Sequence, residues 1–424
     1  MSRHVNHRTI YGLAAVLLVA VVVGSQYYTV SNWLKGPEAK EDIPVLDDSG
    51  ATASGVEATV EAYNGFAFDL YRRYSSGSGN ILFSPYSIST ALSMTYEGAR
   101  GQTAEEMEAV FGFLTNPSNR LPSVAKIYNT LNEEDREYAL HTVNALWIQQ
   151  DYNILKEYVD NIANYYGGDA NILDFASEPE ESRLIINEWV EDRTNDRIKD
   201  LFPAGSIDSL VRLVLTNAIY FKGDWLYEFD PEATSVEDFY VSPSTAVEVD
   251  MMSLHRTFNY ANTDNLQLLE LPYTGDDVSM LILLPKEGHM DEVETKFSDQ
   301  MLSELVDMME ETDVDVYLPR FTFDTKYFMT EDLAEMGMPT AFTSEADFSG
   351  MTGTKELYID MVIHQAFIEV NEKGTEAAAA TGVAMRLSAA LPGEVFRADH
   401  PFIFLIRDLD TGVIMFMGRV SDPS

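Results

Sequence analysis

Apolar side chains recur at helical spacing through the first half of the chain. Residues 56–74 carry Val60, Tyr63 and Phe66 three positions apart, which predicts an amphipathic helix with one buried face. Residues 88–97 are apolar or small nearly all round, which is typical of a helix buried inside the molecule. The same period predicts helices over residues 156–166, 183–198, 301–309 and 330–336.

Strand patterns prevail in the second half of the chain. The run 212–221 is too apolar for an edge strand, so we expect it inside a sheet. Further strands are predicted over residues 141–149, 267–272, 278–284, 314–319, 361–370 and 401–406. No linker and no internal repeat interrupts the chain after Val56. The pattern therefore predicts an α+β fold in a single domain over residues 56–424.

The N-terminus is organised differently. A basic start precedes a wholly uncharged stretch, residues 9–34, which is long enough to span a membrane with its basic end in the cytoplasm. Residues 1–34 are therefore predicted to be a signal-anchor, with a cleaved signal peptide as the alternative. Residues 35–55 are acidic and poor in large apolar side chains, which predicts a flexible stalk. The domain is then expected to be extracellular, either anchored by residues 9–34 or secreted.

The charge balance is strongly acidic. The chain has 69 Asp and Glu against 28 Lys and Arg, a formal net charge of −41. Binding to nucleic acid or to an anionic membrane surface depends on Lys and Arg that neutralise phosphates, so neither is expected as a partner. Membrane contact is expected only through the N-terminal segment. The chain has no cysteine, which excludes disulfides, thiolate metal sites and cysteine nucleophiles.

The sequence lacks the short motifs of enzymatic chemistry. Apart from the N-terminal His4 and His7, none of the seven histidines forms a close ligand pair, so no metal and no other cofactor is expected. There is no nucleophile elbow and no P-loop. Spacing leaves a Ser/His/Asp triad open, because the fold assembles its members from distant positions. We nevertheless expect the protein not to be an enzyme.

The most informative stretch lies late in the chain, at residues 371–382. It follows the strand-like run 361–370 and consists almost wholly of small side chains, with four consecutive alanines and with Gly374 as a hinge of free φ. Ordinary surface loops carry Asn, Asp, Pro and Ser instead. This composition fits a segment that is mobile in one state and packed in a crowded place in another. An alanine-rich linker or short helix would have the same composition.

This stretch and four other blocks resemble the serpin family of protease inhibitors. The blocks occur in the family's order and at its spacing: residues 80–88 (NILFSPYSI), 215–225 (LTNAIYFKGDW), 318–321 (LPRF), 372–380 (EKGTEAAAA) and 398–404 (ADHPFIF). The resemblance covers the chain from about Val56 to the C-terminus. It implies a single-domain serpin fold, in which helices pack around a large central mixed β-sheet, with further sheets and an exposed reactive loop.

The resemblance also implies inhibition as a suicide substrate. A serine protease cleaves the reactive loop, which then inserts into the central sheet while the protease is held as an acyl-enzyme; loop insertion is the known behaviour of serpins. If Thr375 faces inward, strand alternation turns Ala377, Ala379 and Thr381 inward and leaves Glu376 on the wet face. The residues that match the family's hinge are Glu372, Gly374, Thr375, Glu376, Ala377, Ala378, Ala379 and Ala380.

The family's spacing from the hinge predicts the bond that the protease attacks. It places this bond between Ser388 and Ala389, with Leu387 and Ala390 within error. Small or apolar residues favour an elastase-like or subtilisin-like serine protease as the partner. Arg386 would suit a trypsin-like protease, but it lies two residues too early.

Other residues match positions with which the family opens its sheet. Ser84, Ser87, Asn217 and His364 match a polar cluster beneath the centre of the main sheet, and Trp225 matches the tryptophan where insertion begins. Buried polar groups must satisfy one another, and a set that can re-pair gives the sheet two discrete arrangements. None of these residues is expected to be catalytic. A monomer is expected, and the alternative function is that of a non-inhibitory serpin-fold protein used for binding or folding assistance.

Overall fold

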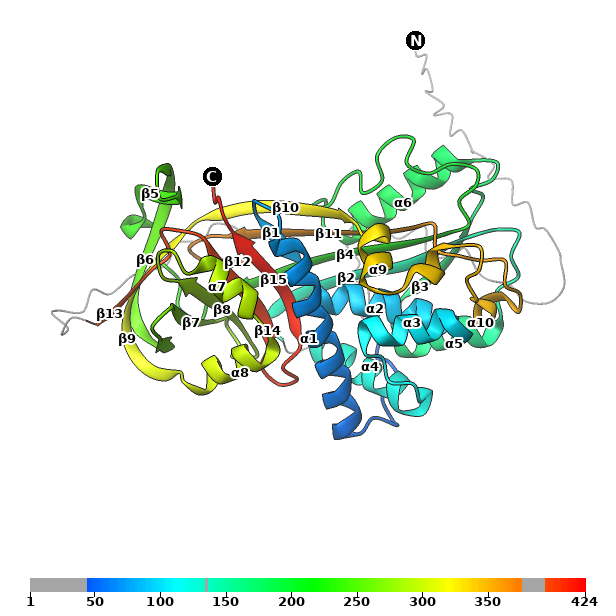
Figure 1. Ribbon diagram of the computed structural model, residues 1–424, viewed down its shortest axis with the longest axis horizontal. Coiled ribbons are helices and arrows are strands. Elements are labelled where there is room, and N and C mark those ends of the chain that lie inside the picture. The colour runs from blue at the N-terminus through cyan, green and yellow to red at the C-terminus, as the bar shows by residue number, and fades with distance from the viewer. Residues whose placement is uncertain (1–43, 134–135, 376–392) are drawn as a thin grey trace, which may run out of the picture. The chain divides into compact units, whose positions relative to one another are not determined.

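The computed structural model describes residues 44–133, 136–375 and 393–424 (Figure 1). The helices are α1 (Ala53–Ser75), α2 (Pro85–Tyr96), α3 (Gly101–Phe111), α4 (Pro117–Leu131), α5 (Lys156–Tyr165), α6 (Pro179–Arg193), α7 (Met290–Lys296), α8 (Asp299–Asp307), α9 (Thr330–Met336) and α10 (Ser349–Thr352), with short 3-10 turns η1 (Pro231–Ala233) and η2 (Pro339–Phe342). The strands are β1 (Ile81–Phe83), β2 (Tyr138–Gln149), β3 (Asp169–Leu173), β4 (Leu213–Asp224), β5 (Ser235–Ser242), β6 (Thr245–Asn262), β7 (Leu266–Pro272), β8 (Val278–Pro285), β9 (Glu310–Pro319), β10 (Phe321–Phe328), β11 (Met361–Val370), β12 (Gly374–Thr375), β13 (Glu394–Arg397), β14 (Phe402–Asp408) and β15 (Ile414–Val420).

The described strands form two sheets. A six-stranded sheet has the order β10-β11-β12-β4-β2-β3, and a nine-stranded sheet runs β1-β15-β14-β8-β7-β6-β9-β13 with β5 paired to β6. In the six-stranded sheet, β11–β4 and β2–β3 are parallel and the other pairs are antiparallel. Helix α6 covers one face of this sheet, and α2 and α5 lie on the other (Figure 1). The predicted α+β fold, with helices around a large mixed sheet, is confirmed.

The central elements owe their positions to their apolar sequences. Every residue of α2 is buried, and the helix begins where the Ser84 hydroxyl accepts a hydrogen bond from the Ser87 N–H, with Pro85 in the first turn. Strand β4 is buried on both faces along most of its length. An edge strand would expose such a run to water, so β4 lies inside the sheet as its composition predicts.

One predicted helix ends earlier than its apolar pattern. The pattern continues to residue 198, whereas α6 ends at Arg193. Asn195 and Asp196 then have φ of 50° and 60°, in the left-handed region that cannot continue a right-handed helix. The chain reaches β4 through a loop that contains a third such residue, Asp200, with φ of 49°.

The folded body begins before the predicted boundary at Val56. The composition predicts a flexible stalk up to residue 55, but residues 44–55 lie on the body and α1 begins at Ala53. Leu46 is buried, and its peptide groups are hydrogen-bonded to Asn129 of α4. One apolar side chain thus attaches a segment whose average composition is polar.

The predicted anchor and the first part of the stalk lie outside the described residues. Within the described part of residues 44–424, no helix is both long and apolar enough to cross a bilayer.

Candidate functional site

The hinge of the predicted loop lies between two strands of the six-stranded sheet. Gly374 and Thr375 form β12, which pairs with Val370 of β11 on one side and with Gly223 and Asp224 of β4 on the other. Farther along, β11 and β4 pair directly with each other in parallel. We call this β11–β4 boundary the seam. The seam is already open at one end, and the chain enters it there.

Glycine is required where the hinge turns into the seam. A Cβ atom at Gly374 would collide with the carbonyl oxygen of Gly223 on β4. The structure therefore gives the close approach of two backbones as the reason for glycine at this position.

Thr375 points into the molecule, where its hydroxyl meets that of Tyr273. It is 2% exposed, and its hydroxyl lies 2.7 Å from the hydroxyl of Tyr273. The Tyr273 ring stacks on Trp225 with centroids 4.5 Å apart. Trp225 in turn donates its indole N–H to the carbonyl of Asn371 (3.0 Å) and its backbone N–H to the carbonyl of Lys373 (2.6 Å). The structure thus brings two of the predicted residues, Trp225 and Thr375, together at the open end of the seam.

Glu372 is buried and tied to the body of the protein. Its carboxylate accepts hydrogen bonds from the guanidinium of Arg320 (2.7 Å) and the hydroxyl of Thr234 (2.6 Å). Its carbonyl accepts a hydrogen bond from the N–H of Phe229 (2.8 Å). Burial alone would raise the pKa of Glu372, but hydrogen bonds from Arg320 and Thr234 hold this pKa below its ordinary value. The carboxylate is therefore charged, and it fixes the start of the hinge.

The four predicted polar residues meet in one buried cluster beneath the seam. The Ser84 N–H donates to Nε2 of His364 (3.1 Å), so Nδ1 carries the ring proton and donates it to Oδ1 of Asn217. The amide of Asn217 donates to the Ser87 hydroxyl (2.6 Å) and to Oδ1 of Asn144 (2.5 Å). His364 lies directly opposite Asn217 in the register of β11 and β4. The bond between their side chains therefore crosses the seam.

The histidine of this cluster is neutral. It is fully buried, and burial lowers the pKa of His364 from 6.5 to about 3. A neutral imidazole offers one donor and one acceptor, which is what Asn217 and the Ser84 N–H require.

Several residues of the site were not predicted from the sequence, among them Arg320, Asn144 and Tyr273. Arg320 lies in the LPRF block, where its charge at the end of a strand was a signal of pairing. Asn144 interrupts the apolar pattern of a predicted strand, which is the mark of a polar group with a buried partner. Tyr273 follows a predicted strand and carries no distinguishing signal.

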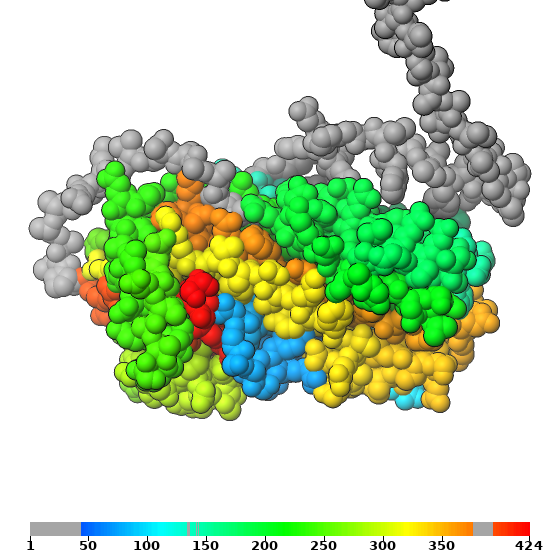
Figure 2. Space-filling view, turned by 90° about the horizontal axis from the view of Figure 1, so that it is seen from above, coloured from blue at the N-terminus to red at the C-terminus, as the bar shows by residue number. Residues whose placement is uncertain are grey.

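The loop between α6 and β4 crosses the seam on the face of the sheet that α6 covers (Figure 1). Lys326 of β10 donates to the carbonyl of Asp200 (2.9 Å), and the guanidinium of Arg197 lies 5.5 Å from the ring of Phe367 in β11. Figure 2 shows the green surface of α6 and this loop beside the yellow and orange surface of β10 and β11. The loop is covalently joined to β4, so these contacts link the two sides of the seam.

The predicted reactive bond lies outside the described residues. This applies to Arg386, Leu387, Ser388, Ala389 and Ala390, and to the hinge residues Glu376, Ala377, Ala378, Ala379 and Ala380. Beyond them the chain is described again from Gly393, and β13 pairs in parallel with β9 of the nine-stranded sheet. The two ends of the predicted loop are therefore held in different sheets.

Comparisons with known proteins cover nearly the whole domain. The sequence model of the family described as "Serpin (serine protease inhibitor)" matches residues 61–423. An uncharacterized serpin-like protein of Methanosarcina mazei is 44% identical over 373 residues, 86% of this chain and 87% of that protein. The leukocyte elastase inhibitor of Homo sapiens is 37% identical over 384 residues, 87% of this chain and 100% of that protein. Among solved structures, human thyroxine-binding globulin is similar with a TM-score of 0.79 and 30% identity, covering 87% of this chain and 100% of that one.

Proposed function

The chain belongs to the serpin family, and on this basis we propose that it inhibits a serine protease as a suicide substrate. Serpins are in general protease inhibitors and not catalysts. The observation that carries the proposal is the position of Gly374 and Thr375 between β11 and β4. The small residues that follow them in the sequence are suited to continue as a strand along the same seam.

The chemistry belongs to the target protease. Its serine hydroxyl attacks the carbonyl carbon of Ser388, the peptide bond to Ala389 breaks, and Ala389 leaves with a new amino group. Ser388 remains ester-linked to the protease. Insertion of the loop must then outrun hydrolysis of this ester, because hydrolysis would release an active protease.

Insertion requires the seam to open along its length. A new strand needs a separation of about 4.8 Å from each neighbour, so β4, β2 and β3 must move away from β11 by about one strand spacing. The side-chain bond between His364 and Asn217 crosses the seam and must break. Ser87 and Asn144 accept hydrogen bonds from the Asn217 amide, so its N–H groups keep their partners when His364 moves away.

The target is proposed to be an elastase-like or subtilisin-like protease. Ser388, Ala389 and Ala390 are small, and the similar human protein is named an inhibitor of leukocyte elastase. A trypsin-like target would require attack after Arg386.

Mixing the purified protein with a panel of serine proteases tests this function. We expect a covalent complex that survives denaturation in SDS with at least one elastase-like or subtilisin-like protease, and a released C-terminal peptide that begins at Ala389. Turnover of the loop by every protease without a stable complex would reject the inhibitory mechanism. A released peptide that begins at Leu387 would instead identify a trypsin-like target.

A binding role without inhibition is the second candidate. It is favoured by the similarity to thyroxine-binding globulin, a protein named for a ligand. Thermal melts distinguish the two functions, because an inhibitor of this kind becomes more stable when its loop is cleaved, whereas a non-inhibitory relative does not need to.

We also propose that the inhibitor domain acts outside the cell, attached through residues 9–34. The uncharged length of this segment and the basic residues before it support the proposal. Fractionation of cells that express the full chain should place the protein in the membrane with its domain accessible from outside. Recovery of a soluble mature form that begins near Ser25 would show a cleaved signal instead.

A further inference from the structure

Residues 44–48, which we call the strap, connect helix α4 to helix α5. We propose that the strap is a clamp that restrains opening of the seam, an inference that rests on the proposed function. The geometry of four features supports it: the contacts of the strap, the attachment of α5, the attachment of α4, and the buried network between them.

The strap is bound to α4 and to α5 by backbone hydrogen bonds. The carboxamide of Asn129 in α4 accepts from the Leu46 N–H (2.8 Å) and donates to the Leu46 carbonyl (3.0 Å). The next residue, Asp47, donates its N–H to the carbonyl of Asn164 in α5 (2.9 Å). Leu46 is 5% exposed, so its side chain adds buried apolar area to these bonds. The strap therefore holds α4 and α5 together through its own backbone.

Helix α5 belongs to the part of the sheet that must move. It is the crossover between β2 and β3, which pair in parallel, and only short connections join it to each strand. The strands β4, β2 and β3 are consecutive in the sheet. When they separate from β11, α5 must travel with them.

Helix α4 precedes β2 in the chain, but its packing ties it to the elements of the nine-stranded sheet. It packs closely on α1, because a Cβ atom at Gly55 of α1 would come within 2.7 Å of the Ser123 hydroxyl in α4. Helix α1 contacts β15 of the nine-stranded sheet. Opening of the seam therefore shifts α5 relative to α4, and the strap crosses the boundary along which they slide.

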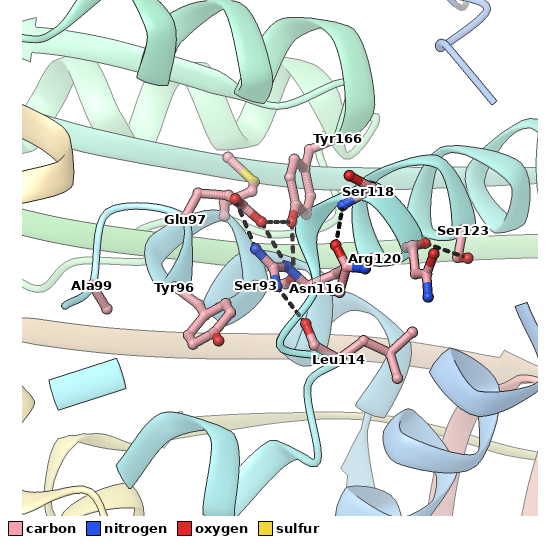
Figure 3. A network of polar contacts seen from close by, with 12 residues as sticks. Ser93, Tyr96, Glu97, Ala99, Leu114, Asn116, Ser118, Arg120, Ser123 and Tyr166 are labelled. Carbon is pink, nitrogen blue, oxygen red and sulfur yellow. Dashed lines mark hydrogen bonds and ion pairs between the residues drawn. The ribbon is translucent and has the colours of Figure 1, made fainter. Parts of the chain in front are cut away.

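Buried hydrogen bonds also tie α5 to α2 and α4. The Tyr166 hydroxyl, directly after α5, donates to Glu97 at the end of α2 (2.7 Å), and Glu97 is paired with Arg120 of α4 (2.8 Å) (Figure 3). Tyr158 of α5 donates to the carbonyl of Met94 in α2 (3.0 Å). Loss of the strap leaves this network in place, so the protein is expected to fold without the clamp and to open more readily.

The test measures how fast the full chain takes up a synthetic peptide with the sequence of residues 375–386, read as the gain in thermal stability over time. Asn129→Ala removes both hydrogen bonds to Leu46, and we expect uptake to become about tenfold faster. Leu46→Ser changes the strap and no helix, and it should accelerate uptake in the same direction. Asn132→Ala is the matched control, because in the described part of the chain the Asn132 amide donates to the carbonyl of Tyr128 in α4, the helix that it directly follows.

The outcomes separate the clamp from the function on which it rests. Equal rates for the parent, Asn129→Ala and Leu46→Ser would overturn the clamp while leaving the inhibitory mechanism intact. Acceleration by Asn132→Ala equal to that of Asn129→Ala would show general loosening of α4 and would also overturn it. A parent protein that takes up no peptide and gains no stability on loop cleavage would reject the proposed function, and the clamp with it.

Discussion

At the scale of the residue, Thr375 is the side chain at which the proposed insertion would begin. It is buried, and the hydrogen-bond partner of its side chain in the described part of the chain is the uncharged hydroxyl of Tyr273, so Thr375→Arg would place a charge next to a neutral partner. Burying an unpaired charge costs several kcal/mol even after relaxation. We therefore expect Thr375→Arg to leave the loop cleavable while the SDS-stable protease complex disappears.

The matched control is the next residue. If the loop inserts as a strand, alternation is expected to turn residue 376 to the opposite face from Thr375, so that an arginine there would stay in water. Glu376→Arg should retain at least half of the trapping efficiency of the parent. Equal trapping by the two variants, at any level, would contradict the alternation.

His364 makes stability depend on acid. The folded protein holds the pKa of His364 near 3, against 6.5 for an unperturbed histidine, so between these values the unfolded chain binds a proton that the folded protein does not. Stability is then lost as pH falls through this window, by up to about 1.4 kcal/mol per pH unit. The free energy of unfolding of the parent minus that of His364→Asn should fall by about 2–3 kcal/mol between pH 6.5 and 4.5. A difference that stays constant with pH would show that His364 is not neutral in the folded protein.

At the scale of elements, the apolar pattern predicted the helices and strands that are buried. The all-round apolar helix α2 and the strands β4 and β11 were predicted because their burial leaves a direct mark on the sequence. The early end of α6 was missed because the apolar spacing continues beyond Arg193. The left-handed conformation of Asn195 and Asp196 ends the helix, and the spacing of apolar residues does not reveal it.

The candidate site was predicted only in part. The cluster of Ser84, Ser87, Asn217 and His364 followed from a family resemblance, and the structure brings these residues together. The pairing of Glu372 with Arg320 depends on contacts between distant segments, and spacing along the chain does not report such contacts. The attachment of the strap depends on one residue, Leu46, within a polar segment, and average composition conceals it.

The loop that crosses the seam is an element whose removal should ease insertion. Lys326→Met breaks the hydrogen bond to the Asp200 carbonyl and keeps the length of the side chain. A hydrogen bond from a charged group contributes about 1.5–3 kcal/mol when it is well shielded, and less at this exposed site, so we expect peptide uptake to accelerate about threefold. Lys296→Met is the control, because Lys296 pairs with Glu292 within α7. An unchanged rate for Lys326→Met would mean that the loop is displaced before the rate-limiting step.

At the scale of the whole molecule, the proposed cleavage should convert the protein into a more stable form. The described chain stops at β12 in the six-stranded sheet and resumes before β13 in the nine-stranded sheet, so both ends of the predicted loop are anchored before cleavage. Under the proposed mechanism, cleavage near Ser388 frees the N-terminal part of the loop, which is then expected to gain hydrogen bonds to both β11 and β4. With about 1 kcal/mol for each new bond, the midpoint of thermal unfolding should rise by about 10 °C or more. The gain should shrink in Thr375→Arg, because insertion stops at its first residue, and it should persist in Glu376→Arg. A cleaved parent that melts at the temperature of the intact protein would show that the seam does not accept the loop, and that β12 marks a fixed turn instead of the start of a strand.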